Sequence, residues 1–195
     1  MDIGANLGIY SLLARRHGFE TMVFEPEPNH AQFLQRNKHL FTRVFPIALS
    51  DQKGVADFFV GREGKLASSS LVKASGSTLY DHTVPVDVDT FSNVIAENAI
   101  DPSRVRLMKV DVEGAEVSVI QGMIAFLESG HRPAIWCEVR GDSKGRSAGS
   151  YRTVWDLLKR YDYQAYDDNS LKPFDGDASR KTQVFDLLFQ AAETK

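Results

Sequence analysis

Short apolar runs alternate along the chain with longer segments in which apolar residues recur at three- and four-residue steps. This alternation is typical of βαβ units, which build a mostly parallel sheet covered by helices, so the predicted fold class is α/β. The apolar runs predict strands at residues 21–24, 44–48, 55–60, 84–88, 105–110, 134–139, 163–166 and 184–189. The periodic segments predict helices at residues 9–17, 29–39, 115–128 and 151–161.

The first predicted strand is truncated. Residues 1–3 directly precede a glycine-containing turn, whereas a strand commonly has about five or six residues. In a doubly wound sheet this strand would be central. Either residues upstream of Met1 complete it or the strand is a stub, and in the first case we expect added upstream residues to raise the melting temperature.

The βα alternation stops between residues 54 and 89. Two predicted strands, at residues 55–60 and 84–88, follow each other without a helix between them. The intervening residues 61–77 are rich in Gly, Ser and Lys and show no period. We interpret this part as a β-rich insertion with a mobile loop. No linker or repeat divides the rest, so residues 1–195 are expected to form one domain.

Composition excludes several classes of protein. The formal net charge of −3 lacks the basic excess of nucleic-acid binders. Apolar stretches stay far below the roughly 18 to 20 residues of a membrane span, and the first residues lack the pattern of a signal peptide. Cys137 is the only cysteine, which rules out an intrachain disulfide and a thiolate metal cluster. A cytoplasmic location is the simplest expectation.

A glycine loop follows the short first strand. Gly4 and Gly8 flank Asn6, a residue that readily adopts left-handed backbone conformations, so the loop can turn tightly and approach a ligand. The dinucleotide pattern G-x-G-x-x-G is absent. The carboxylate of Asp2 suits a cationic ligand and does not suit phosphate. The alternative is a plain strand-to-helix turn capped by Asn6.

Polar residues follow the next two predicted strands. Glu25 lies about twenty residues past the loop, where Rossmann-like folds hold ribose hydroxyls, although it could be a solvated acid. Ser50 and Asp51 follow the run at residues 44–49, and Asp51 could accept a hydrogen bond from an adenine amino group. Turn chemistry explains this second pair nearly as well.

An acidic cluster is expected at the end of the predicted strand 105–110. If the extended geometry continues, Lys109, Asp111 and Glu113 share one face, and Glu138 at the end of the neighbouring strand converges on the same place. Asp111 and Glu113 are the first candidates for a general base, with Glu138 next. The carboxylates could instead hold a divalent cation. Glu116 falls in the first turn of a helix, where the macrodipole favours an acid.

Other reactive residues have plainer interpretations. The histidines lie in loops or, as His30 does, on predicted surface helices. Cys137 lies inside a predicted strand and is expected to be a small core residue. The loop at residues 140–146 carries three cations that could close over an acceptor, or could form a solvated face.

Taken together, these motifs resemble the FkbM family of S-adenosylmethionine-dependent methyltransferases. The matching segments are DIGANLG at residues 2–8, VFEPEP at 23–28, ALSD at 48–51, the serines at 68–70, VDVDTF at 86–91 and LMKVDVEGAE at 107–116. Gly122 and the strand at 133–138 match as well. Phe91 and Ser92 depart from the family's usual T-L-D element.

The resemblance implies a Rossmann-like class I methyltransferase fold with a seven-stranded, mostly parallel sheet. It implies S-adenosylmethionine as the cofactor, and methyl transfer, usually to a hydroxyl of a sugar, polyketide, lipid or other small molecule. The methionine portion is then assigned to the loop residues Asp2, Gly4, Asn6 and Gly8, the ribose to Glu25 and the adenine to Ser50 and Asp51. Asp111, Glu113 and Glu138 are assigned to catalysis, with no metal.

Two rival functions stay open at this point. A nicotinamide-dependent oxidoreductase would share the fold and the acid at Glu25, although the loop lacks its glycine pattern. A degenerate domain that binds the cofactor without turnover would share the whole site. The sequence leaves the acceptor and the oligomeric state undetermined.

Overall fold

A seven-stranded sheet forms the centre of the protein, which was analysed as a computed structural model that describes residues 1–62, 69–73, 80–141, 149–176 and 184–192. The strand order is β3-β2-β1-β7-β8-β10-β9, and β10 runs antiparallel to both of its neighbours. The strands are β1 (Asp2–Ile3), β2 (Met22–Phe24), β3 (Arg43–Phe45), β7 (Leu107–Val110), β8 (Ala134–Arg140), β9 (Tyr163–Asp167) and β10 (Val184–Ala191). The predicted α/β class and mostly parallel sheet are therefore confirmed.

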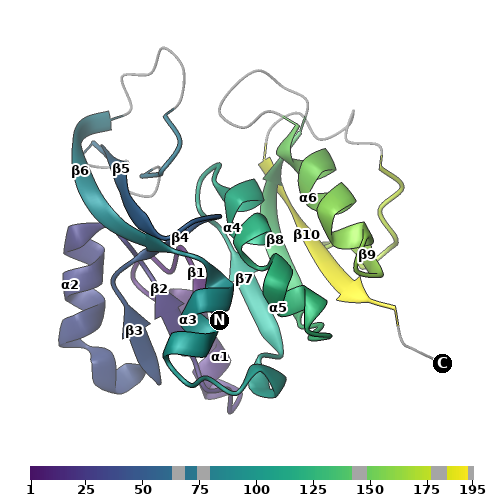
Figure 1. Cartoon of the computed structure of the whole chain (residues 1–195), viewed down its shortest axis with the longest axis horizontal. Helices are drawn as coiled ribbons and strands as arrows, with labels where there is room; N and C mark the ends of the chain where they lie inside the picture. Colours follow the sequence, from purple (N-terminus) through teal and green to yellow (C-terminus); the bar gives the residue numbers. More distant parts are fainter. Residues whose placement is uncertain (63–68, 74–79, 142–148, 177–183, 193–195) are drawn as a thin grey trace.

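Helices cover both faces of this sheet (Figure 1). One face carries α1 (Ile9–Arg16) and α2 (Pro28–Arg36), and the other carries α3 (Phe91–Glu97), α4 (Glu116–Gly122), α5 (Ile124–Glu128) and α6 (Ser150–Lys159). Short 3-10 helices, η1 (Lys38–Leu40) and η3 (Pro102–Arg104), complete the connections. None of the described helices has the length and apolarity needed to cross a bilayer.

Strand β1 has two residues and lies at the centre of the sheet, as the sequence predicts. Asp2 is in register with Val23 of β2 on one side and with Lys109 of β7 on the other. Ile3 is 1% exposed and belongs to the main hydrophobic core. Val23 and Phe24 of β2 and Met108 and Val110 of β7 are almost fully buried, which explains why these strands are mostly apolar in the sequence.

The predicted strand at residues 44–48 is wrong as a single element. Its first part belongs to β3 in the main sheet, and its end begins β4 (Ala48–Leu49) in a second sheet. Pro46 lies between them, and proline has no N–H with which to continue a ladder. This residue therefore marks the transfer of the chain from one sheet to the other.

The β-rich insertion forms a separate sheet of three strands. Its order is β4-β6-β5, where β5 (Gly54–Gly61) and β6 (Tyr80–Asp89) are antiparallel and β4 is parallel to β6. The long pair β5 and β6 rises beside the carboxyl ends of the central strands (Figure 1). The insertion can thus form one wall of a site at that edge of the sheet.

Two helix predictions need correction. The segment predicted as one helix at residues 115–128 consists of α4 and α5, separated at Met123, which is fully buried. Helix α3 was not predicted, although Phe91, Val94 and Ile95 are buried at helical spacing and the Thr90 side chain accepts a hydrogen bond from the Asn93 N–H.

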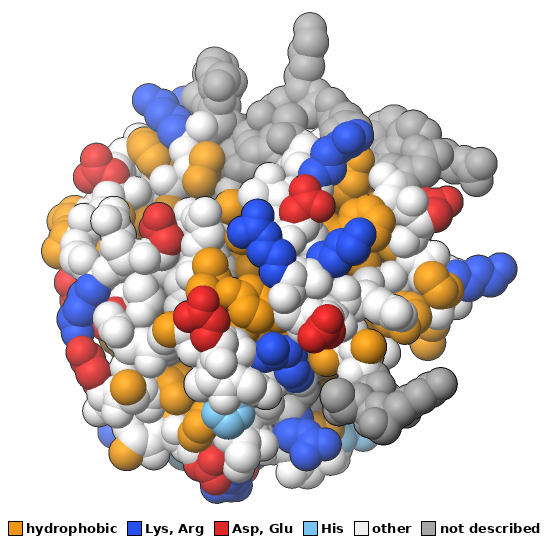
Figure 2. All heavy atoms as spheres, turned by 45° about the vertical axis from the view of Figure 1, so that its right-hand side comes forward, with side chains coloured by type: hydrophobic (Ala, Val, Ile, Leu, Met, Phe, Trp, Pro, Cys, Tyr) orange, Lys and Arg blue, Asp and Glu red, His pale blue; other side chains and the backbone are white. Residues whose placement is uncertain are grey.

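The surface over α6 and the C-terminal strands carries charges of both signs. On the face shown in Figure 2, Lys and Arg side chains are interspersed with Asp and Glu. This face therefore lacks the large field of positive charge that nucleic-acid binders present.

Candidate functional site

The glycine loop after β1 is held in a conformation that few residues can adopt. Gly4 and Gly8 have φ of 79°, and Asn6 has φ of 52°, so the predicted left-handed asparagine is confirmed. A Cβ on Gly4 would lie 1.8 Å from the Asp111 carbonyl oxygen. The loop can contact the end of β7 only because this residue is glycine. The residue that caps α1 is Gly8, which excludes capping by Asn6.

Glu25 is buried beside this loop and is not a solvated acid. It is 6% exposed, and its two carboxylate oxygens accept hydrogen bonds from the Asn6 N–H at 2.7 Å and from the Glu27 N–H at 2.8 Å. Burial, the largest cause, raises the pKa of Glu25 to about 7, against the opposing effect of these two bonds. Glu25 is thus a buried hydrogen-bond acceptor, and a charged ligand bound next to it would change its pKa.

A cavity connects the glycine loop, Glu25 and the end of β7, and we call it the loop cavity. Gly4 and Asn6 line it from the loop, Glu25 from the end of β2, and Asp111 and Glu113 from the segment after β7. It encloses about 120 Å³, which is below the roughly 300 to 1,000 Å³ of typical ligand pockets. A nucleoside-sized ligand would therefore have to displace lining side chains.

Sequence reasoning missed two residues at this cavity. His30 was expected on a surface helix but is 9% exposed and lines the cavity. Glu27, which is 1% exposed, is the N-cap of α2, and its side chain accepts a hydrogen bond from the His30 N–H at 2.7 Å. The sequence does contain a signal for this helix start, because Glu27 is an acid that can cap a helix and Pro28 follows it. Recognising it would have placed the first turn of α2 beside Glu25.

Phe58, Ser69 and Leu71 of the insertion line the cavity, and Ser70 connects this segment to the turn after β7. This serine is fully buried and forms an antiparallel bridge with Phe59, and its hydroxyl donates to the Glu113 carbonyl at 2.9 Å. The same hydroxyl accepts a bond from the Val72 N–H. The prediction of a mobile loop over residues 61–77 is therefore wrong at Ser70, whereas residues 63–68 and 74–77 lie outside the described part of the chain.

Four of the predicted cofactor residues do not line the loop cavity, and Gly8 is one of them. Asp51 is exposed and accepts a hydrogen bond from the Ser50 hydroxyl at 3.0 Å, and neither residue is part of the described lining. The cavity ends just before them, at Ile47 to Leu49. The Asp2 carboxylate accepts a bond from the Ser11 hydroxyl at 2.8 Å and faces a second cavity. The roles assigned to these residues remain predictions.

The expected acidic cluster is present. Asp111, Glu113 and Glu138 each bring a carboxylate oxygen to within 4.8 Å of the others. The sequence predicted that strand alternation would bring Asp111 and Glu113 together. In the structure the extended geometry ends before Glu113, which has a φ of 56°. The turn formed with Gly114, rather than strand alternation, brings Glu113 back beside Asp111 and the end of β8.

Two cations compensate this cluster unevenly. Lys109 Nζ lies 2.8 Å from Asp111 Oδ2, and Arg140 Nη2 lies 2.9 Å from Glu113 Oε2 but 3.8 Å from Glu138 Oε1. Burial first, and then Asp111 and Glu113, raise the pKa of Glu138 to about 8. Glu138 is therefore the carboxylate of the three with the weakest ion pair and a pKa near neutrality.

Glu116 is a buried acid. It lies in the first turn of α4, as predicted, but it is 1% exposed, and its carboxylate also accepts a hydrogen bond from the Gly114 N–H at 2.7 Å. Burial raises its pKa. The side chain thus stabilises the turn that positions Glu113. Cys137 is fully buried and its pKa is raised by burial, which agrees with the expected core role.

The arrangement can support two kinds of chemistry. Three clustered carboxylates could hold a divalent cation through oxygen ligands, although two cationic side chains already contact them. Alternatively, a carboxylate with a pKa near neutrality can accept a proton from a substrate hydroxyl. Of the predicted cationic loop, Arg140 contacts the cluster and residues 142–146 lie outside the described chain.

Comparisons with known proteins agree on one family. The sequence profile of the methyltransferase FkbM domain matches residues 2–165. Two curated relatives are Methyltransferase 1 of Beauveria bassiana, 29% identical over 152 residues, and Methyltransferase sdnD of Sordaria araneosa, 28% identical over 156 residues. Each alignment covers 63% of this chain, and 57% and 59% of the two relatives, so the chain spans just over half their length.

A solved structure has the same fold. Methyltransferase FkbM from Methylobacillus flagellatus KT superposes with a TM-score of 0.56 at 16% sequence identity. The superposition covers 96% of this chain and 42% of that protein. At this identity the similarity concerns the fold alone.

Proposed function

Since the chain belongs to the FkbM methyltransferase family, we propose that it transfers a methyl group from S-adenosylmethionine to a hydroxyl oxygen of a small-molecule or glycan acceptor. The observation that carries the proposal is that Asp111 and Glu113 belong both to the loop cavity and to the acidic cluster. A ligand held at the glycine loop would therefore extend to the carboxylates of the acidic cluster, which can accept a proton. Ligands of open α/β sheets bind at this carboxyl edge of the strands.

The residues around the loop cavity fit this cofactor. Each carboxylate oxygen of Glu25 accepts one backbone hydrogen bond and keeps a further lone pair, so the carboxylate can also accept from two ribose hydroxyls. The acidic character of the cavity suits a sulfonium cation, and it does not suit the pyrophosphate of a nicotinamide dinucleotide. When bound, S-adenosylmethionine supplies an electrophilic methyl group.

We assign the role of general base to Glu138. A hydroxyl is a poor nucleophile until its proton is removed, and a base is most effective when its pKa lies near the working pH. Asp111 and Glu113 are each held by a close cation, whereas Glu138 is 3.8 Å from Arg140 and has a pKa of about 8. In this assignment the acceptor oxygen forms the bond to the methyl carbon, and its proton moves to the Glu138 carboxylate.

Asp111 and Glu113 then act as positioning residues. Lys109 and Arg140 hold these two carboxylates in ion pairs, and the negative charges of Asp111 and Glu113 raise the pKa of Glu138. The same charges would align a cationic methyl donor with the acceptor oxygen. Alignment of the two reacting groups is a large part of catalysis for a displacement of this kind.

A ligand screen by thermal shift tests the proposed function. A ligand that binds only the folded protein raises the melting temperature, so S-adenosylmethionine and its demethylated product should raise it, and nicotinamide dinucleotides should not. A panel of hydroxylated compounds, assayed for the demethylated product, then tests turnover. Stabilisation by NAD alone would contradict the proposal. Cofactor binding with no turnover on any acceptor would favour a non-catalytic domain.

A further inference from the structure

Helices α1 and α2 expose large apolar side chains on their outer sides. Ile9 and Leu13 of α1 are 62% and 49% exposed, and Phe33 of α2 is 45% exposed. Ile9 and Leu13 are four residues apart, so they project from the same side of their helix. Two helices thus present apolar side chains at positions where a surface helix usually carries polar ones.

The two helices belong to the same outer surface of the molecule. Both lie on one face of the central sheet (Figure 1). They share a small hydrophobic core, in which Leu12 of α1 packs against a buried cluster that includes Leu34 of α2 and Phe41. Because the buried sides of both helices meet in this core, their exposed sides face solvent together. We call these exposed sides the α1–α2 surface.

The α1–α2 surface also carries exposed cations. They lie in the last turns of the two helices and just after α2, and they are Arg15, Arg16, Arg36 and Lys38. Within the described part of the chain, none of the four forms an ion pair with an acid. Residues 5–19 and 28–43 contain no Asp or Glu, although the whole chain has a formal net charge of −3. The α1–α2 surface is therefore basic in a chain of net negative charge.

The helix macrodipole explains only part of this pattern. A cation in the last turn of a helix is favourable, which accounts for the arginines at the ends of α1 and α2. It does not account for the apolar side chains on the same surface. Helix α6 shows the difference, because it also ends in a cation, Lys159, but none of its large apolar side chains is exposed. The combination of cations with exposed apolar side chains therefore distinguishes the α1–α2 surface.

The position of the apolar side chains indicates what kind of partner fits. Ile9, Leu13 and Phe33 line neither the loop cavity nor the cavity at the Asp2 carboxylate, so they project from helices rather than surround a pocket. The anchor residues of protein–protein interfaces usually fill well-packed pockets. Apolar side chains that project from helices beside cations are typical of helices that lie at the boundary between lipid headgroups and acyl chains. Anionic headgroups would complement the charge of the surface.

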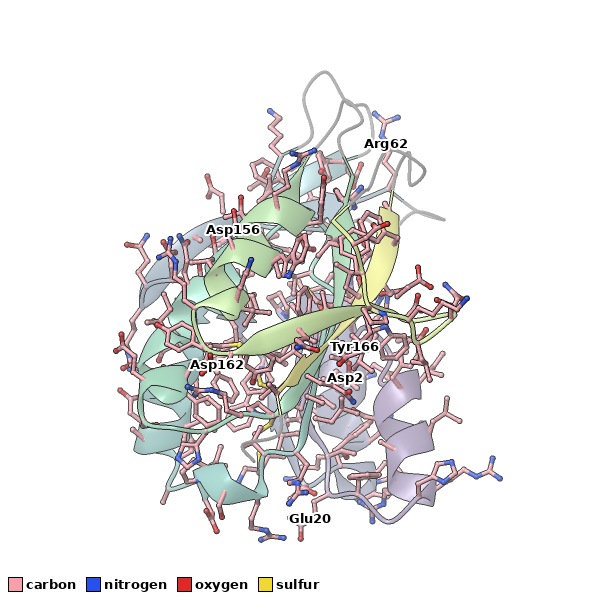
Figure 3. All side chains as sticks on the ribbon, turned by 90° about the vertical axis from the view of Figure 1, so that its right-hand side faces the viewer. Asp2, Glu20, Arg62, Asp156, Asp162 and Tyr166 are labelled. Atoms are coloured by element: carbon pink, nitrogen blue, oxygen red, sulfur yellow. The ribbon has the colours of Figure 1, made fainter. Side chains whose placement is uncertain are left out.

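We propose that the α1–α2 surface binds to the surface of a membrane that contains anionic lipids. Ile9, Leu13 and Phe33 enter the boundary between headgroups and acyl chains, and the cations contact the headgroups. The helices end far from the insertion: in Figure 3, Glu20, which follows α1, and Arg62 of the insertion lie at opposite ends of the molecule. Binding through this surface therefore leaves the insertion free.

Sedimentation with lipid vesicles tests the proposal without relying on methyl transfer. The protein should bind vesicles of phosphatidylcholine with about 30% phosphatidylserine, and should bind pure phosphatidylcholine about tenfold or more weakly. The double variant Arg36→Gln, Lys38→Gln should weaken binding to the anionic vesicles by about tenfold or more, and Phe33→Ser by about threefold or more. The matched control, Lys159→Gln, Arg160→Gln, removes two exposed cations at the end of α6 and should bind like the parent.

Several outcomes would overturn the proposal. One is the absence of binding to the anionic vesicles at low ionic strength, where attraction between charges is strongest. An equal loss in the α6 control would show that only the total charge matters, and full binding by Phe33→Ser would exclude insertion of apolar side chains. If Phe33→Ser melts below the parent, Ile9→Ser, at a more exposed position, takes its place with the same expected loss. Binding of a DNA duplex but not of vesicles would assign the basic surface to nucleic acid.

Discussion

The contact between Gly4 and the Asp111 carbonyl is the closest backbone approach in the candidate site. A methyl group at Gly4 would lie 1.8 Å from that oxygen, at a φ of 79° that already disfavours side chains. We expect Gly4→Ala to lower the free energy of unfolding by about 3 kcal/mol or more, which combines backbone strain and steric displacement.

A matched control exists for this substitution. Gly18 has a φ of 84°, and no atom lies within 4 Å of the place that a methyl group would occupy there, so Gly18→Ala carries the strain without the clash. Urea unfolding of both variants separates the two effects. Equal losses in the two variants would mean that the contact with Asp111 contributes nothing to stability.

Glu25 leads to a pH prediction for cofactor binding. Its pKa is about 7 in the ligand-free protein, and ribose hydroxyls are held best by the ionised carboxylate. Affinity for S-adenosylmethionine should therefore rise with pH through about 7 and level off above it. Glu25→Gln should remove this dependence and weaken binding by about 1.5 to 3 kcal/mol at high pH, measured by calorimetric titration. The same pH profile in the variant would exclude Glu25 as its source.

Glu138→Gln tests the assignment of the base. If Glu138 accepts the proton, kcat of the parent should rise with pH up to about 8, where its carboxylate is ionised. The variant should lose kcat by roughly 10²-fold or more and should bind S-adenosylmethionine within a few-fold of the parent. The comparison variants are Asp111→Asn and Glu113→Gln. A larger loss of kcat in either of them, with Glu138→Gln active, would transfer the role of base to that residue.

At the level of elements, Ser70 connects the insertion to the turn after β7. Its hydroxyl bonds the Glu113 carbonyl and the Val72 N–H while fully buried. Ser70→Ala should lower stability by about 1 to 3 kcal/mol, because it leaves a partly buried carbonyl and a partly buried N–H short of a partner. Hydrogen exchange at Val72 should speed up more than exchange in β8. Uniform acceleration across the protein would argue against a local connection.

The elements differ in how far the sequence predicts them. Strands β7 and β8 are mostly apolar, and an acid follows the apolar part of each, so both their position and the convergence of Asp111 with Glu138 could be predicted. The split of α4 from α5 at Met123 could not. It lies next to Gly122, where a Cβ would lie 2.0 Å from the Ser50 carbonyl oxygen. That contact joins residues distant in sequence.

The burial of polar residues was the least predictable feature. Glu116 and His30 both lie at helix starts, where exposed polar residues are common, and a local pattern cannot tell which side of a helix faces the core. Ser70 is buried because the insertion folds back onto the turn after β7. Such burial is decided by tertiary packing, which periodicity does not encode.

For the whole molecule, the raised carboxyl pKa values predict how stability depends on pH. Glu25 and Glu138 ionise at about 7 and 8 in the folded protein, against an ordinary value of 4.5. Between these values the folded state retains protons that the unfolded state has released, so the free energy of unfolding falls as pH rises. The stabilisation is complete below about pH 4.5 and is lost by about pH 8.

Calorimetric melting from about pH 5 to 8.5 checks this trend. The melting temperature of the ligand-free parent should fall across the range, and the double variant Glu25→Gln, Glu138→Gln should show a shallower decline. An identical slope in the double variant would place the responsible groups elsewhere. Saturation with S-adenosylmethionine should also reduce the slope, since a bound cation favours the ionised carboxylates.

The contact between Gly4 and the Asp111 carbonyl also limits which parts of the site can change shape independently of the rest. Because the glycine loop and the carboxylate turn pack directly on each other, neither can change shape without displacing the other. The insertion, by contrast, is a separate sheet, joined to the carboxylate turn by the Ser70 hydroxyl and lining the loop cavity with Phe58, Ser69 and Leu71. The outer part of the insertion can therefore change shape with less effect on the glycine loop and the carboxylate turn than a change in either of these has on the other.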